Sequence, residues 1–380
     1  MKSIFQKIAL PAVPVDLLES LRIFFEKGTL EQKTLFEQLY VDKWFEYNLP
    51  QMDLDVEAIM SSYKVRFMAS IIGNDAATPL RPSDGFDIYK GEIPRLGHKF
   101  PMSAKKLRKL LGILESNRYK DQQKFNEVYK MLMGDVREAY LGCKDTADHI
   151  ILQALSNNGV AEFTPALNNP DGRKFKVDYE MPEANKLNAT ANWTDANKNT
   201  INPFEELQRI KLDFQANGID FSTGEMLLSP VLYAWMLNCP AVRKAILGTD
   251  KSNGVVTDEQ FAATLRTYGL PAITQVVKRS AIAKDGKRQS ELINPWNENM
   301  IVFKPAGKIG EVQPAFEDNE IIEEDNVEYI DAGNGMRVAK WAVGESTGQK
   351  AGEYTQASWR ALPIITEIKG IVNYQVRGIE

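Results

Sequence analysis

One short motif in the chain has the residue types of a catalytic site. The sequence GESTG at residues 344–348 matches G-x-S-x-G, the turn that presents the nucleophilic serine of α/β-hydrolases. That serine needs a helix after it, and an acid and a histidine later in the chain. Gly352 would interrupt such a helix, and both histidines, His98 and His149, precede Ser346. A Gly/Ser loop is the favoured interpretation, and a serine hydrolase is kept as an alternative.

Candidates for metal or phosphate chemistry are equally sparse. Cys143 and Cys239 lack the spacing of zinc ligands and are too few for a disulfide framework, which fits folding in a reducing cytosol. Residues 317–331 hold eight acids and no base, but they lack the D-x-D-x-D-G pattern of a calcium loop. A solvated or interface loop is favoured over an ion site there. The sequence therefore predicts no enzyme, with no catalytic, cofactor-binding or metal-binding residue and no cofactor.

Basic residues gather in one part of the chain. The whole chain carries 46 basic and 51 acidic residues, a net charge of −5, without the basic excess typical of a dedicated nucleic-acid binder. The local cluster also has few aromatic neighbours for stacking on bases. Ionic contacts between protein subunits are therefore favoured over phosphate contacts. The predicted intersubunit contacts are Arg95, Lys99, Lys105, Lys106, Arg108 and Lys109.

The elements that position these residues begin with a long helix. Apolar residues repeat at intervals of three and four between Asp121 and Asn157, with no proline in that stretch. This pattern predicts a helix at about 117–157, with Leu132, Val136 and Tyr140 buried against a sheet. A coiled coil remains an alternative, although the flanking charges are irregular.

The segment from Gly73 to Gly112 has a different character. Four prolines and several glycines exclude a continuous helix, and residues 86–89 alternate like a short strand. We predict a long loop or hairpin that folds on a neighbouring subunit and not on its own.

The second half combines helix starts with buried strands. Asn202 and Pro203 are typical of a helix N-terminus, with Glu205 in a capping-box-like position, and residues 257–260 (TDEQ) form another start signal. The charge-free residues 226–242 contain Pro230 and Pro240, so buried helices are favoured over a membrane span. Helices and strands segregate along the chain, which predicts the α+β class.

Four stretches stand out in this order of elements: residues 204–210 (FEELQRI) through 217–219 (NGI), 226–233 (MLLSPVLY), 300–310 (MIVFKPAGKIG) and the closing strands at 359–376. Together with the order of elements, they resemble the tailed-phage major capsid proteins of the Hong Kong 97-like fold, most closely the lambda-type capsid protein E family. The resemblance implies an N-terminal arm and lead-in at 1–72, an E-loop at 73–112, and a peripheral domain at 113–201 that includes the spine helix. It also implies an axial domain at 202–335 and a return to the peripheral domain at 336–380.

By the same resemblance, the chain would self-assemble through hexamers and pentamers into an icosahedral head shell around double-stranded DNA. Implied partners are a separate scaffolding protein, a portal, a decoration protein and DNA bound without sequence specificity, with no membrane. The implied location is the virion, after assembly in the host cytoplasm. Alternatives are a cellular encapsulin-like nanocompartment shell and a generic oligomeric adaptor.

Overall fold

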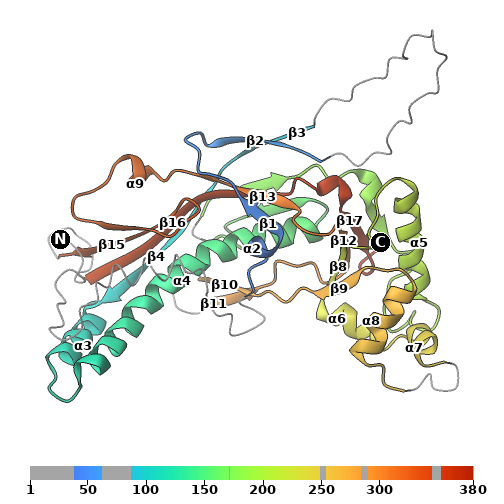
Figure 1. The fold of residues 1–380 in the computed structure, drawn as a ribbon, viewed down its shortest axis with the longest axis horizontal. Coiled ribbons are helices and arrows are strands. Elements are labelled where there is room, and N and C mark those ends of the chain that lie inside the picture. The colour runs from blue at the N-terminus through green and yellow to red at the C-terminus, as the bar shows by residue number, and fades with distance from the viewer. Residues whose placement is uncertain are drawn as a thin grey trace, which may run out of the picture.

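An elongated molecule is built around one long helix (Figure 1). The computed structural model describes residues 38–61, 87–170, 172–248, 254–283, 290–344 and 352–379. For residues 125, 128, 129, 131–133, 283 and 290 the description covers the backbone alone. A six-stranded sheet lies over one end of the helix, and a five-stranded sheet with its own helices lies at the other end.

The long helix is α4 (Asp121–Ser156), which the sequence places at about 117–157. Its buried residues recur at three- and four-residue intervals and end beside Asn158 and Gly159, whose positive φ angles of 54° and 86° stop the helix. Val136 is fully buried, Tyr140 is partly buried, and the side chain of Leu132 lies outside the described residues. The stripe consists of Val136, Ala139, Cys143, Ala147, Ile150, Ile151, Ala154 and Leu155.

A glycine lets the neighbouring strand approach α4 closely. The His98 Nε2 atom lies 3.0 Å from the carbonyl oxygen of Ala139, one turn from Gly142 on the helix. A methyl group at position 142 would collide with the imidazole of His98. His98 therefore docks a strand on the helix as a hydrogen-bond donor.

The six-stranded sheet is centred on one long strand, β16 (Gly352–Ile364). On one side, β16 pairs with β15 (Met336–Val343), and β15 pairs with β14 (Glu328–Asp331). On the other side, β16 pairs with β13 (Gly310–Ala315), and β13 pairs in parallel with β1 (Phe45–Tyr47). The sixth strand, β4 (Arg95–Ser103), is antiparallel to β16 over its whole length. Helix α3 (Ala104–Glu115) follows β4 and packs on α4, while the short α9 (Asp318–Ile321) joins β13 to β14.

The inner strands of the five-stranded sheet are buried on both faces. Its order is β7 (Lys186–Asn188), β17 (Val372–Gln375), β12 (Met300–Lys304), β8 (Glu225–Leu228) and β9 (Ala272–Gln275). Met226 and Leu228 face one apolar core, while Leu227 faces the core that contains α4. This double burial explains why β8 reads as a continuous apolar run.

Four helices cover the outer face of this sheet: α5 (Pro203–Ala216), α6 (Pro230–Leu237), α7 (Pro240–Leu247) and α8 (Asp258–Thr267). The first three begin with proline at a first-turn position, and Thr257 with Gln260 forms a capping box at α8. Asn202 stands at the N-cap of α5 as expected, but its side chain makes no cap hydrogen bond.

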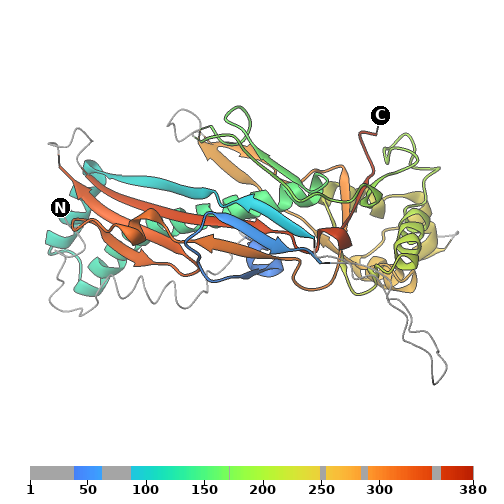
Figure 2. The ribbon, with the colours of Figure 1, turned by 90° about the horizontal axis from the view of Figure 1, so that it is seen from above.

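Three two-stranded ribbons complete the strands of the described chain. They are β2 (Asp55–Ile59) with β3 (Ile88–Glu92), β5 (Val160–Phe163) with β6 (Phe175–Asp178), and β10 (Ser280–Ala283) with β11 (Ser290–Ile293). The first ribbon buries Val56, Ala58 and Tyr89 against the main core. Figure 2 shows the second and third ribbons projecting from the same side of the molecule.

The structure corrects the prediction for residues 73–112. Residues 88–112 form β3, β4 and most of α3, and β4 pairs with β16 of its own subunit; residues 73–86 lie outside the described residues. The prolines and glycines did exclude a helix, but β4 accommodates them: Gly97 lies against the carbonyl oxygen of Ala357, and Pro101 is opposite Tyr354. The prediction that this segment rests on a neighbour instead of its own subunit is wrong for residues 88–112.

The predicted domain limits also differ from the two sheets. Strands β13 and β14 belong to the six-stranded sheet, although they fall within 202–335. Strand β17 belongs to the five-stranded sheet, although it falls within 336–380. Glu206 of α5 accepts hydrogen bonds from the Tyr374 hydroxyl and from Trp193 Nε1, so these distant segments join the same core.

The buried stripe of α4 generates a stability prediction. Ile151 is completely buried, and Ile151→Ala should lower the free energy of unfolding by about 2–5 kcal/mol through lost burial and a residual cavity. Urea unfolding of unassembled subunits measures this change. Leu212→Ala on α5 is the control, because Leu212 is 54% exposed and its truncation should cost little. Equal losses in the two variants would contradict the packing of α4.

Candidate assembly surfaces and buried charge junctions

Two of the predicted contact residues are engaged within their own chain. The Arg95 Nε atom lies 3.0 Å from a carboxylate oxygen of Glu317, and its guanidinium reaches Asp318 at 3.9 Å. Lys99 Nζ lies 5.1 Å from the ring centre of Tyr354, a cation–π distance. These side chains stabilise the face of the six-stranded sheet on which they lie.

The other four predicted residues lie on α3. Lys106 is half-buried, with its Nζ 3.5 Å from a carboxylate oxygen of Asp135 on α4. Lys105, Arg108 and Lys109 are exposed and follow the spacing of one helix face. The structure therefore brings three basic residues together on an open surface, which is the arrangement that an intersubunit contact needs.

A buried carboxylate on α4 joins three separate segments. Asp148 accepts hydrogen bonds from the backbone N–H groups of Tyr40 at 3.1 Å and Val41 at 2.7 Å, at the start of α2 (Tyr40–Trp44). The Lys278 Nζ atom donates to Asp148 at 3.0 Å and to Asp145 at 2.7 Å. Asp148 is fully buried and Lys278 is 1% exposed. One carboxylate thus holds the first described helix and the chain after β9 against α4.

Burial and ion pairing shift the pKa values of Asp148 and Lys278 in opposite directions. Burial raises the pKa of Asp148 to about 6, although Lys278 and the two backbone donors oppose the rise. Burial lowers the pKa of Lys278, but Asp148 and Asp145 outweigh it, so the net shift is upward. At neutral pH both partners are therefore ionised. Sequence reasoning missed this junction; the detectable signal is a pair of charges, Lys144 and Asp148, on the apolar side of the helix.

A second buried lysine lies beneath the six-stranded sheet. Lys340 of β15 stands between Glu328 of β14 and Thr355 of β16, and its Nζ lies 3.8 Å from a carboxylate oxygen of Glu353. Burial lowers the pKa of Lys340 to about 8, and Glu353 offsets only part of that effect. Such a group stabilises only while its partners stay in place, so it favours this register of β14, β15 and β16.

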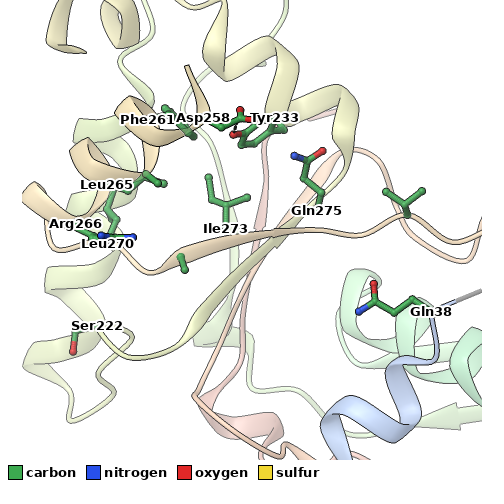
Figure 3. Close-up of a pocket in the computed structure, with 13 residues that line it drawn as sticks. Gln38, Ser222, Tyr233, Asp258, Phe261, Leu265, Arg266, Leu270, Ile273 and Gln275 are labelled. Carbon is green, nitrogen blue, oxygen red and sulfur yellow. Dashed lines mark hydrogen bonds between the residues drawn. The ribbon is translucent and has the colours of Figure 1, made fainter. Parts of the chain in front are cut away.

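A groove of about 640 Å³ runs between α6, α8 and the edge strand β9 (Figure 3). Phe261, Leu265 and Ile273 give it an apolar wall. The Tyr233 hydroxyl donates to Asp258 at 2.7 Å, and burial together with this carboxylate raises the pKa of Tyr233 to about 12. No histidine, cysteine or lysine is among the described residues that line the groove. It suits apolar packing better than acid–base chemistry.

A larger cleft of about 1080 Å³ lies between β4, α4 and two of the ribbons. His98 lines it, but its Nε2 hydrogen is committed to Ala139 and its ring packs on Phe100 with centroids 4.8 Å apart. Among the residues that the structure describes, no cluster of three or more His, Cys, Asp or Glu side chains could hold a metal ion. Ser346 lies outside the described residues.

No helix in the described part of the chain is long and apolar enough to cross a membrane.

No curated protein matches the sequence. A model of the family described as phage major capsid protein E matches residues 31–376. The chain belongs to the phage major capsid protein E family.

The chain is also similar in fold to a solved structure. A prophage capsid protein from E. coli CFT073 is 10% identical, with a TM-score of 0.52, and the match covers 94% of this chain and 98% of that chain. A phage-related protein from Bordetella bronchiseptica RB50 is 11% identical with a TM-score of 0.48, covering 95% and 98% of the two chains. A chain of the satellite phage P4 procapsid is 10% identical with a TM-score of 0.45, covering 95% and 99%.

These findings confirm two predictions from the sequence. The fold is the α+β, Hong Kong 97-like fold of phage capsid proteins, as the order of elements indicated. The protein is a structural component of a capsid shell, and it acts by self-association. The functional surfaces of such a protein are the ones that meet other copies.

The buried junction at Asp148 generates a second prediction. Lys278→Met removes the cation beside a fully buried carboxylate and should cost about 3–5 kcal/mol of unfolding free energy. Asp145→Asn is the control, because the Asp145 side chain is 42% exposed and its pair with Lys278 should contribute about 0–1 kcal/mol. The double variant Asp148→Leu/Lys278→Met should recover part of the loss. Urea unfolding of unassembled subunits distinguishes these cases, and equal effects in the two single variants would argue against a stabilising junction.

His149 generates a pH prediction. Burial lowers the pKa of His149 to about 4, below the ordinary 6.5, so the unfolded chain binds this proton more readily than the folded one. The stability that His149 contributes is therefore complete above pH 6.5 and is lost as the pH falls towards 4, by on the order of 3 kcal/mol. The pKa of Asp148 is raised in the folded chain, so protonation of Asp148 increases the free energy of unfolding as the pH falls from 6 to 4.

The variant His149→Gln separates these two effects because glutamine does not titrate. Its unfolding free energy, measured by urea titration from pH 7 to 4, should fall less steeply than that of the unmodified chain. Parallel curves for both proteins would contradict the assignment to His149.

Proposed function

We propose that copies of this chain assemble, through hexamers and pentamers, into an icosahedral head shell that encloses double-stranded phage DNA. The observation that carries the proposal is the family match over residues 31–376. A shell of this kind has a defined set of companions, so we also propose a separate scaffolding protein, a portal and a decoration protein as partners. Assembly would take place in the host cytoplasm before the subunit becomes part of the virion.

The net charge of the chain supports storage of DNA without tight binding. The net charge of −5 gives no general attraction for phosphates, and each neutralised phosphate would add a salt-dependent term to affinity. A container whose wall holds its genome weakly allows DNA to enter and leave. We accordingly propose no sequence-specific DNA contact and no catalytic role.

The division into parts follows the sheets. We propose that the axial domain comprises the five-stranded sheet with α5 to α8, and that the peripheral domain comprises the six-stranded sheet with α3 and α4. The sequence places the E-loop at 73–112, and we propose the β2–β3 ribbon as its base, because this ribbon pairs Asp55–Ile59, which precede that range, with Ile88–Glu92, which lie within it. Of the six predicted intersubunit residues, Lys105, Arg108 and Lys109 remain candidates for contacts between copies.

An encapsulin-like nanocompartment is the main alternative, and purified particles distinguish the two. The expected result is closed shells in electron micrographs when the chain is expressed with its scaffolding partner, together with nuclease-protected DNA in particles isolated from phage-producing cells. Particles that hold a cargo enzyme and no DNA would favour the alternative. Soluble monomers or small rings under all conditions would contradict the shell.

A further inference from the structure

Helix α3 presents a basic surface that the described residues of its own subunit do not cover. Lys105, Arg108 and Lys109 are exposed along one face, and Leu111 beside them is 41% exposed. We call these four residues the α3 basic face. Leu110, on the opposite side of the helix, is fully buried, so α3 is fixed in orientation and cannot turn this face inward.

A second surface near α9 has the opposite charge around an apolar centre. Ile321 is 62% exposed and Ile322 is 76% exposed, and the adjoining Glu324 and Asp325 are exposed as well. We call these four residues the α9 acidic edge. Apolar side chains surrounded by charges are typical of the centre and rim of a protein–protein contact.

The two surfaces lie on opposite sides of the six-stranded sheet. On β4, His98 points to α4, whereas Arg95, three residues earlier, points to the other face and pairs with Asp318 of α9. Figure 1, viewed down the shortest axis of the molecule, places α9 and α3 at the same end and on opposite long edges. The sheet therefore prevents the acidic edge of one copy from reaching its own basic face.

We infer that neighbouring copies meet through these surfaces, with the α9 acidic edge of one copy against the α3 basic face of the next. The inference rests on the proposed shell function and names the contacting surfaces within it. Both surfaces combine exposed apolar side chains with charges, and the charges have opposite sign, so the two are complementary in both respects. Because they are different patches on opposite edges, the contact is heterologous and repeats from copy to copy around a closed ring.

Nucleic acid is the other chemistry that a basic helix face could bind. DNA would account for Lys105, Arg108 and Lys109, but it would repel Glu324 and Asp325 and leave the exposed Ile321 and Ile322 without a partner. A second copy accounts for both surfaces at once.

Charge exchange tests the inference. The variants are Arg108→Glu/Lys109→Glu, Glu324→Lys/Asp325→Lys, and the combination of all four substitutions. Each pair alone places like charges together and should slow shell assembly on the order of tenfold or more at low salt, whereas the combination should restore most of the rate. Light scattering follows the rate, electron microscopy counts the particles, and thermal melting of unassembled subunits checks that each variant folds. Lys244→Glu, an exposed position on α7, is the control and should leave assembly unchanged.

The outcomes separate this inference from the proposed function. If the unmodified chain forms no particles, the shell function fails and the inference fails with it. If the unmodified chain and all charge variants form particles at the same rate, only the inference is overturned. Failure of the combined variant to recover, an equal loss in Lys244→Glu, or a change confined to DNA retention would each overturn it as well.

Discussion

A helix of 36 residues with one apolar stripe is the constraint on which the rest of the structure depends. At 1.5 Å per residue it is about 54 Å long. The buried stripe of α4 lies in one extended core, which runs from beneath the six-stranded sheet to the inner face of the five-stranded sheet, while the core outside that second sheet contains no residue of α4. Elongation is therefore a consequence of covering α4, and it produces the long edges on which copies can be placed side by side.

Apolar packing alone would leave the position of α2 on α4 loosely defined. The Asp148 carboxylate adds direction, because it must accept from the N–H groups of Tyr40 and Val41 while it faces the Nζ of Lys278. Lys144 adds a second link, with its Nζ 2.9 Å from Asp42 on the same short helix. The Asp148 carboxylate and the Lys144 ammonium lie on one face of α4 and meet different partners on α2, the backbone N–H groups at its start and the Asp42 carboxylate, which fixes the axial register of α2. We regard the cost of burying Asp148 as offset by this specificity.

Sequence reasoning reached the features that depend on local chemistry. The periodicity of α4, the proline starts of α5 to α7 and the capping box of Thr257 and Gln260 follow from nearby residues, and the order of elements indicated the family. It did not reach features that depend on distant partners. Pro94, Gly97 and Pro101 exclude a helix but cannot reveal that β16, more than 250 residues away, pairs with β4. The same applies to Lys278 and Asp148, and to Arg95, Lys99 and Lys106, whose partners within the chain are visible only in the fold.

The distribution of charge suggests how such a subunit can assemble without aggregating. The ion pair of Asp148 and Lys278 is buried within the chain and helps to fix the shape of a copy before it meets another. The charges left at α3 and α9 are exposed, and each exposed pair contributes only about 0–1 kcal/mol and is weakened by salt. A contact of that strength is reversible, so a wrongly placed copy can leave. Stability then comes from closure, because a copy within a complete shell is held on several sides and all of its weak contacts must break together before it can dissociate.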